Sequence, residues 1–244
     1  MIIHQIYGLY KDNKPMNELF TAGSTKWQEY ADRNNHIYKL WNAEQVEELV
    51  NTFTNIKEYY HTVRHPVMKV DIARFLILYQ FGGLYCDLDC IPNTNENFII
   101  DETKLYLCNY IWTPNGELEP TPIIDIEVIY SPKYNIELFN YIAFYVPSQI
   151  EEKNKIEIYH QWKIRYIFQT TGPVSFRRFL KQNKIEHLPI STCGLKKTIK
   201  YGDLDGVDVN KEFGDQDYKI LSYFSLSYNP HGNKIMKYKK YVKK

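Results

Sequence analysis

Apolar and polar residues alternate in blocks along the first part of the chain. Residues 2–9 open with a short apolar run closed by Gly8, a pattern that predicts a buried strand. Residues 25–33 have helical spacing, residues 37–41 form a second apolar run, and Asn42 precedes another helical pattern. Strand, helix, strand and helix at these intervals predict an α/β sheet with parallel pairing.

The segment that follows carries the clearest helical signal. Pro66 suits the first turn of a helix, and residues 67–81 contain no helix breaker, so about four turns are expected. Gly82 and Gly83 then end the helix, a common role of glycine at a helix C-terminus.

Two carboxylates follow these glycines. Residues 84–91 predict a strand that stops at Pro92, and alternation places Tyr85, Asp87 and Asp89 on one face of it. Unpaired buried charge is costly, so a metal ion or a basic group must compensate these carboxylates. Oxygen ligands of this kind suit Mg²⁺ or Mn²⁺.

Two further Asp-x-Asp pairs, Asp203/Asp205 and Asp215/Asp217, lie in polar stretches near glycine and predict solvated turns.

The preceding helix carries Asp71 and Arg74, three residues apart and therefore on one helical face. Arginine offers a planar fork for phosphate or sugar oxygens, and aspartate accepts hydrogen bonds from hydroxyl groups. An ordinary intrahelical ion pair explains the same spacing. The residue pattern alone leaves both interpretations open.

Beyond residue 100 the expected elements are strands over 104–112 and 123–130, a helix over 135–146, and a turn at 170–173 before a helix near 174–182. The tail from about residue 230 is expected to be a loop with a Lys- and Tyr-rich end. No internal repeat or low-complexity linker interrupts the chain, which favours a single domain.

Composition narrows the class of protein. Among 244 residues, 30 Lys and Arg face 29 Asp and Glu, so the formal charge of +1 gives no basic field for nucleic acid. A hydrophobic content of 44% excludes a disordered chain. No window reaches the roughly 18 apolar residues that span a bilayer, and no signal-peptide pattern follows Met1. The four cysteines form no CxxC pair, which favours a reducing compartment. Together these features lead us to expect a soluble cytoplasmic protein without a transmembrane segment.

The run VDIARFLILYQFGGLYCDLDC closely resembles the sugar-binding signature of family thirty-two glycosyltransferases, the mannosyltransferase and capsular-polysaccharide type. It is similar also to the glucosyltransferase domains of clostridial toxins. The opening IIHQIYG, the stretch WQEYADRNNHIYKLWN and the turn Thr171-Gly172-Pro173 resemble further family segments. The resemblance is strong over residues 1–95, patchy to 180 and faint afterwards.

The resemblance implies a GT-A fold, a Rossmann-like mixed sheet flanked by helices, and metal-dependent transfer of a hexose with retention of configuration. Asp89 would bind Mn²⁺ or Mg²⁺. Asp87 would contact the ribose and sugar hydroxyls or a metal-bound water. Asp71 and Arg74 would hold the hexose, Arg74 would also direct positive charge at the diphosphate, and Tyr7 would stack on the nucleobase. The implied partners are a UDP- or GDP-hexose donor and a glycan, glycolipid or protein acceptor.

The same pattern includes Gly83 and Tyr85 among the substrate-binding positions. His231 would complete the metal site and Lys234 would contact the diphosphate, in a C-terminal segment that differs from the usual family ending. His4 is expected to be an interior histidine instead of a catalytic base. Residues 1–95 would form the nucleotide-sugar half, and 96–244 the acceptor-side half with the C-terminal loop.

Two other functions remain open. A metal-dependent nucleotidyltransferase also combines a glycine turn with Asp-x-Asp, although its carboxylates normally follow the glycines by a helix. A binding module without turnover would retain the same pocket.

Overall fold

The computed structural model describes residues 1–9, 15–16, 18–92, 97–111, 122–161, 163–193, 197–200 and 220–223. Up to residue 92 the elements are β1 (Ile2–Ile6), α1 (Glu18–Arg33), β2 (Ile37–Trp41), α2 (Ala43–Asn51), α3 (Thr54–Tyr60), α4 (Pro66–Phe81), β3 (Gly83–Cys86) and β4 (Cys90–Pro92). Later elements are β5 (Tyr106–Ile111), β6 (Pro122–Ser131), α5 (Ile136–Asn140), a π-helical segment (Tyr141–Tyr145), α6 (Val146–Asn154), α7 (Ile158–Gln161), α8 (Lys163–Thr170), α9 (Pro173–Asn183), β7 (Leu188–Pro189), a 3₁₀ turn (Ile190–Cys193), β8 (Lys197–Lys200) and β9 (Ile220–Tyr223).

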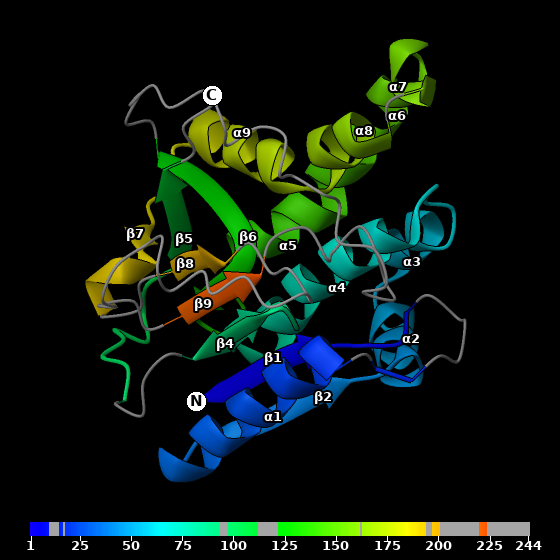
Figure 1. Cartoon of the computed structure of the whole chain (residues 1–244). Coiled ribbons are helices and arrows are strands. Elements are labelled where there is room, and N and C mark those ends of the chain that lie inside the picture. The colour runs from blue at the N-terminus through cyan, green and yellow to red at the C-terminus, as the bar shows by residue number, and fades with distance from the viewer. Residues whose placement is uncertain are drawn as a thin grey trace, which may run out of the picture.

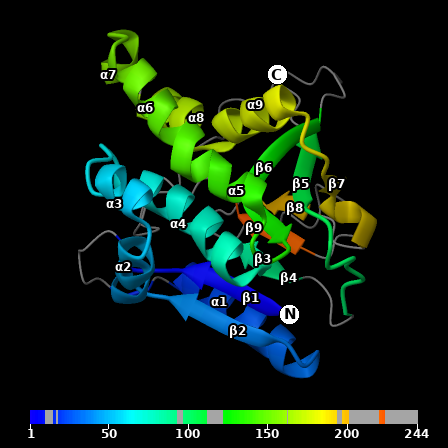
Figure 2. The same ribbon diagram turned by 180° about the vertical axis from the view of Figure 1, so that it is seen from behind.

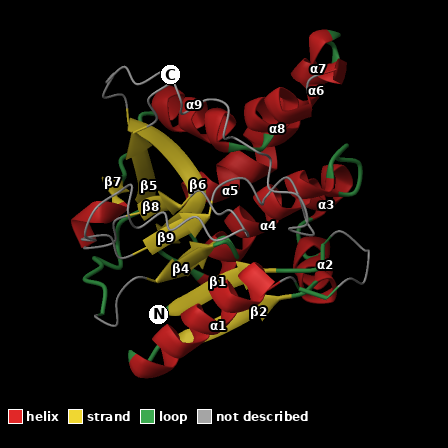
Figure 3. Ribbon diagram, in the orientation of Figure 1, coloured by secondary structure: helices red, strands yellow, loops and turns green. Residues whose placement is uncertain are grey.

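The described strands form two sheets. The larger has six strands in the order β2-β1-β3-β6-β5-β7, and the smaller has three in the order β4-β9-β8. In the larger sheet β1 is parallel to β2 and β3, whereas β6 is antiparallel to both β3 and β5. The predicted mixed α/β sheet flanked by helices is confirmed (Figures 1 and 3).

The two faces of the larger sheet are covered by different helices. Alternating side chains of β1 and β3, such as Ile3 and Leu84, pack with Trp27 and Tyr30 of α1. On the opposite face, Tyr85 belongs to a larger apolar cluster that includes residues of α2, α4, α5 and α9. The view from behind shows α4 and α5 side by side over this second face (Figure 2). No helix in the described ranges combines the length and apolar character that a membrane crossing requires.

Helix α4 is buried on all sides because nearly every position is apolar. Pro66 occupies its first turn, and Gly82 caps its end with a φ of 66° and an N–H that donates to Leu78 O. Both features were predicted from the sequence. Asn42 likewise begins α2 as predicted, and the structure adds a capping box with Gln45. Asp71 and Arg74 are therefore fixed within one of the most deeply packed elements of the fold.

The predicted continuous strand over residues 84–91 is wrong. Strand β3 ends at Cys86, and a turn carries the chain to β4, which pairs with β9 in the other sheet. Asp87 and Asp89 thus lie in this turn and do not share a strand face. The turn forms because Cys90 N–H donates back to Asp87 O, at 3.0 Å. We call residues 87–90 the aspartate turn.

Other predicted elements are present with altered bounds. Helix α1 begins at Glu18, before the expected start at residue 25, and the helix expected over 135–146 divides into α5, the π-helical segment and the start of α6. The elements α3, α7, α8, β7, β8 and β9 were not predicted from the sequence. The tail from residue 230 lies outside the described residues.

Strand β6 is irregular where it meets the aspartate turn. Its partners on β5 shift between Leu107, which faces Ile129, and Cys108, which faces Asp125. The residues between these positions form a bulge, a feature that interrupts a ladder and redirects backbone groups. The carbonyl groups of Ile126 and Glu127 consequently bond to Arg74 and to the backbone of Asp87.

We predict that Gly83→Ala destabilises the protein much more than Gly8→Ala. Both glycines have positive φ, +97° and +86°, but a Cβ at Gly83 would lie 2.3 Å from Ile2 O, whereas nothing lies within 4 Å at Gly8. Positive φ alone costs about 1–2 kcal/mol for an L-residue. The clash at Gly83 adds roughly another 2 kcal/mol, since β1 must move. Urea unfolding of both variants measures the difference, and equal losses would contradict this account of Gly83.

Candidate functional site

The aspartate turn is held by hydrogen bonds from three sides. Asp87 N–H donates to Glu127 O of β6 at 2.8 Å. The side chain of Gln5, from β1, donates to Asp87 O at 3.1 Å. The indole N–H of Trp27, from α1, donates to Cys90 O at 3.0 Å. Strands β1 and β6 and helix α1 therefore fix the backbone that carries the two aspartates.

Helix α1 approaches this turn closely because it has a glycine there. A Cβ at Gly23 would lie only 2.1 Å from Leu88 O. Any larger residue would push the helix away from the turn, together with the carboxylates on either side of Leu88. Gly23 therefore permits the close contact between α1 and the aspartate turn, and the sequence did not predict this role.

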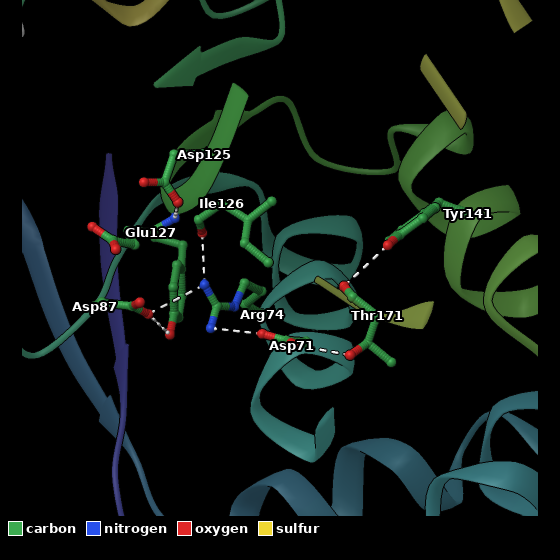
Figure 4. Close-up of polar contacts among 9 residues, drawn as sticks. Asp71, Arg74, Asp87, Asp125, Ile126, Glu127, Tyr141 and Thr171 are labelled. Atoms are coloured by element: carbon green, nitrogen blue, oxygen red, sulfur yellow. Dashed lines mark hydrogen bonds and ion pairs between the residues drawn. The ribbon is translucent and has the colours of Figure 1, made fainter. Parts of the chain in front are cut away.

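Arg74 joins the helix to the aspartate turn. Its Nη2 lies 3.1 Å from Asp71 Oδ1, and its Nη1 lies 3.3 Å from Asp87 Oδ1. Nη1 also donates to Ile126 O at 2.7 Å. Figure 4 shows the guanidinium between the two carboxylates, with the carbonyl of β6 above it. The structure shows the intrahelical Asp71–Arg74 pair, and Arg74 extends it to Asp87 of the Asp-x-Asp motif. Binding of sugar or phosphate oxygens by these residues stays a prediction.

Tyr85 closes the other side of the guanidinium. Arg74 Cζ lies 4.9 Å from the centre of the Tyr85 ring, a cation–π distance. The Tyr85 hydroxyl donates to Asp87 Oδ1 at 2.7 Å. Tyr85 is buried, and its contacts orient Asp87 from within the protein.

Burial dominates the electrostatics of this cluster. It raises the pKa of the Asp71 and Asp87 carboxyls, while Arg74 acts to lower the pKa of both. Burial also opposes the charge on Arg74, yet the nearby carboxylates, Asp87 above all, keep its pKa above the usual value. The Nε atom of Arg74 is buried and has no hydrogen-bond partner in the described part of the chain. Such an unpaired buried donor is unusual in a folded protein.

Three residues of this site come from the second half of the chain and were not predicted as site residues, although the Thr171-Gly172-Pro173 turn resembles a family segment. Thr171 donates a hydrogen bond to Asp71 Oδ2 at 2.8 Å, and Tyr141 donates to Thr171 O at 3.0 Å. Asp125, which directly precedes the bulge of β6, is buried and acts to raise the pKa of Asp71 and Asp87. Its place within the apolar run IIDIEVIY could have indicated Asp125 from the sequence.

Of the other predicted site residues, Asp89 and Tyr7 lie in or beside the aspartate turn. Asp89 is buried in the aspartate turn. Tyr7 is half-buried against the Phe20–Leu88 cluster and therefore adjoins the turn. Gly83 lies against the backbone of β1, where there is no space for a side chain. His231 and Lys234 lie outside the described residues, as do the Asp-x-Asp pairs at 203–205 and 215–217.

His4 is an interior histidine, as predicted. A carbonyl can only accept a hydrogen bond, so the 2.8 Å contact with Gly82 O places a proton on Nε2. The indole N–H of Trp41 donates to Nδ1 at 3.1 Å, which requires an unprotonated Nδ1. His4 is fully buried, and burial lowers its pKa to about 4.

The chain is similar to known glycosyltransferases. Residues 11–106 match a family described as the glycosyltransferase sugar-binding region containing a DXD motif. The match covers less than half of the chain, so it shows similarity of this segment to the family. The matched residues include Asp71, Arg74 and the aspartate turn, whereas Asp125, Ile126, Tyr141 and Thr171 lie outside them.

A curated relative and a solved structure extend the comparison. Inositol phosphoceramide mannosyltransferase 1 of Schizosaccharomyces pombe is 34% identical over 90 residues, which are 36% of this chain and 27% of that protein. The PaToxG glycosyltransferase structure is similar with a TM-score of 0.50 and 17% identity, over 75% of this chain and 69% of that one. The structural similarity confirms the predicted fold class.

We predict that Arg74→Lys lowers the free energy of unfolding by about 2 kcal/mol or more, because a single ammonium cannot contact Asp71, Asp87 and Ile126 O from two nitrogens. The control is Arg33→Lys, whose exposed pair with Glu29 predicts a change within about 0.5 kcal/mol. Urea unfolding compares the two variants. Similar losses of stability in both variants would show that the contacts of the buried Arg74 guanidinium add no more stability than an exposed ion pair.

We also predict that His4 contributes to acid sensitivity. The unfolded chain takes up a proton near pH 6.5 and the folded chain only near pH 4, so this contribution is complete above pH 6.5 and declines as the pH falls to 4. The loss amounts to about 3 kcal/mol. In His4→Gln, stability should decline less steeply over that range. Asp71 and Asp87, with raised pKa values, act in the opposite sense in both proteins. Parallel pH profiles would contradict the prediction.

Proposed function

We propose that this protein is a glycosyltransferase that transfers a hexose from a nucleotide-sugar donor to a hydroxyl group of an acceptor, with a divalent metal ion and with retention of configuration. The observation that carries the proposal is the buried Asp71–Arg74–Asp87 cluster at the aspartate turn, within a segment similar to the DXD sugar-binding family. Carboxylates and a guanidinium are the groups that bind sugar hydroxyls and phosphates.

Asp87 and Asp89 would hold Mn²⁺ or Mg²⁺. Carboxylate oxygens suit either ion, and the carboxylates of Asp71, Asp87 and Asp125 outnumber the single guanidinium near them. In the described ranges no group of three or more His, Cys, Asp or Glu side chains is arranged to hold a metal. Such ions are commonly completed by substrate phosphates and water, which fits a site with two protein ligands. When bound, the ion would neutralise charge on the leaving diphosphate.

Within this site Arg74 would act mainly by orienting carboxylates. Its Nη atoms already contact the carboxylates of Asp71 and Asp87 and the carbonyl of Ile126. Asp71 and Asp87 would then accept hydrogen bonds from donor hydroxyls through their remaining lone pairs. Tyr7, beside Leu88 of the turn, would stack on the nucleobase.

The chemical step needs no nucleophile from the protein. The bond between the anomeric carbon and the diphosphate oxygen breaks, and an acceptor hydroxyl attacks from the same side. The departing phosphate oxygen takes the proton of that hydroxyl. His231 and Lys234, if they reach the diphosphate, would add a ligand and a positive charge there.

The donor is a UDP- or GDP-hexose, and the acceptor is a glycan, a glycolipid or a protein. A mannosyl donor is the first to test, because the curated relative is a mannosyltransferase. The test incubates the protein with Mn²⁺ and a panel of UDP- and GDP-hexoses and measures release of the nucleoside diphosphate. Hydrolysis of one donor supports the proposal. Binding without hydrolysis would favour a binding module, and consumption of a nucleoside triphosphate with release of pyrophosphate would favour a nucleotidyltransferase.

We predict that Asp89→Asn reduces donor hydrolysis at least about 100-fold, because a neutral amide replaces a metal-binding carboxylate. Asp205→Asn, in another Asp-x-Asp pair, should leave the rate within about twofold. Isothermal titration with Mn²⁺ and the nucleoside diphosphate should show the same contrast in binding. Equal losses in the two variants would mean that the aspartate turn is not the metal site.

A further inference from the structure

Thr171 brings a distant part of the chain to the sugar-binding segment. It lies in the turn between α8 and α9, and its hydroxyl donates to Asp71 Oδ2 at 2.8 Å. Both residues are buried, with exposed fractions of 1% and 4%. The contact joins residues 100 positions apart, so only the tertiary fold creates it.

The turn that carries Thr171 is itself fixed. Its carbonyl accepts the hydroxyl of Tyr141, from the π-helical segment, at 3.0 Å. The Ser175 hydroxyl donates to Thr170 O at 2.8 Å, and the N–H groups of Thr171 and Gly172 both donate to Ile167 O. A side chain at Gly172 would meet the backbone of α8 at 3.0 Å, so the turn is closely packed. The Thr171 hydroxyl is consequently held at a defined position (Figure 4).

The two oxygens of Asp71 are held by different elements. Oδ1 contacts Arg74 Nη2 on the same helix, at 3.1 Å, whereas Oδ2 accepts the bond from Thr171. One contact would leave the carboxylate free to rotate about its terminal torsion, which has broad minima. Two contacts fix its plane. Lone pairs remain on both oxygens, since a carboxylate has about four acceptor sites.

We propose that Thr171 is a positioning residue for Asp71, and that its hydroxyl fixes the orientation in which Asp71 receives the donor sugar. This inference rests on the proposed function, in which Asp71 binds the hexose. Thr171 acts through Asp71 and does not itself contact the donor. Removing the hydroxyl should therefore affect recognition of the sugar more than recognition of the nucleotide.

The test compares Thr171→Val, which removes the hydroxyl at nearly constant shape, with Thr171→Ser, which retains it. The control is Thr170→Val, because Thr170 is also buried but its hydroxyl bonds to Tyr166 O and Ile167 O, within its own helix. The probes are UDP-glucose, GDP-mannose, UDP and GDP, each titrated with Mn²⁺.

In Thr171→Val, affinity for the sugar nucleotide should fall about tenfold, the effect of losing a hydrogen bond to a charged group. Affinity for the matching nucleoside diphosphate should remain within about twofold. Thr171→Ser should retain most of the sugar-nucleotide affinity, and Thr170→Val should retain the wild-type ratio of the two affinities. Equal weakening of both ligands in Thr171→Val, or no rescue by serine, would overturn the proposal.

A second measurement does not depend on the donor. Urea unfolding of Thr171→Val, Asp71→Ala and the double variant forms a double-mutant cycle. The folding equilibrium constants should depart from multiplicative behaviour by about fivefold or more. Multiplicative effects would overturn the proposal at its structural level. If the wild-type protein binds neither sugar nucleotide while the cycle shows coupling, the proposed donor fails and the contact with Asp71 stands.

If Thr171→Val does not fold, Tyr141→Phe replaces it. That variant loses the hydroxyl that holds Thr171 O, so sugar-nucleotide affinity should weaken in the same direction by a smaller factor, about threefold. An unchanged ratio of sugar-nucleotide to nucleotide affinity would count against the proposal.

Discussion

The site depends on one buried guanidinium. Arg74 neutralises carboxylates that could not otherwise remain ionised away from water, and it does so through two nitrogens directed at Asp71 and Asp87. Buried ion pairs recover their desolvation cost only with good geometry and additional hydrogen bonds. Here the carbonyl of Ile126 and the ring of Tyr85 provide such contacts. Without these contacts, Asp71 on α4 and Asp87 in the aspartate turn would lose the partner that stabilises their negative charge.

The backbone around Arg74 is shaped to permit this arrangement. Gly82 and Gly83 turn the chain from α4 into β3 with positive φ angles, and Gly23 lets α1 lie directly on the aspartate turn. The bulge in β6 directs the Ile126 carbonyl towards the guanidinium. Each of these positions departs from regular geometry, which is common where a fold supports a functional site.

Much of this could be predicted from local sequence signals. Pro66, the apolar run after it and the two glycines defined α4 and its end, and the Asp71–Arg74 spacing placed both residues on one helical face. The alternation argument failed after Asp87 because a strand continues only while a neighbour pairs with it, and the bond from Asp87 N–H to Glu127 O ends the pairing with β6. Thr171 could not be assigned in the same way, since its contact with Asp71 depends on how α8 and α9 pack.

The origin of these contacts limits what the sugar-binding region can do by itself. The family match covers residues 11–106, but the Arg74 fork also requires Ile126, and Asp71 requires Thr171. Tyr141, which holds Thr171, lies in a π-helical segment, and such irregular turns often occur at functional sites. A carboxylate buried at Asp71 with only Arg74 as partner would be less well oriented and less well stabilised. The second half of the chain is therefore part of the site, because it completes the hydrogen bonds on which the first half depends.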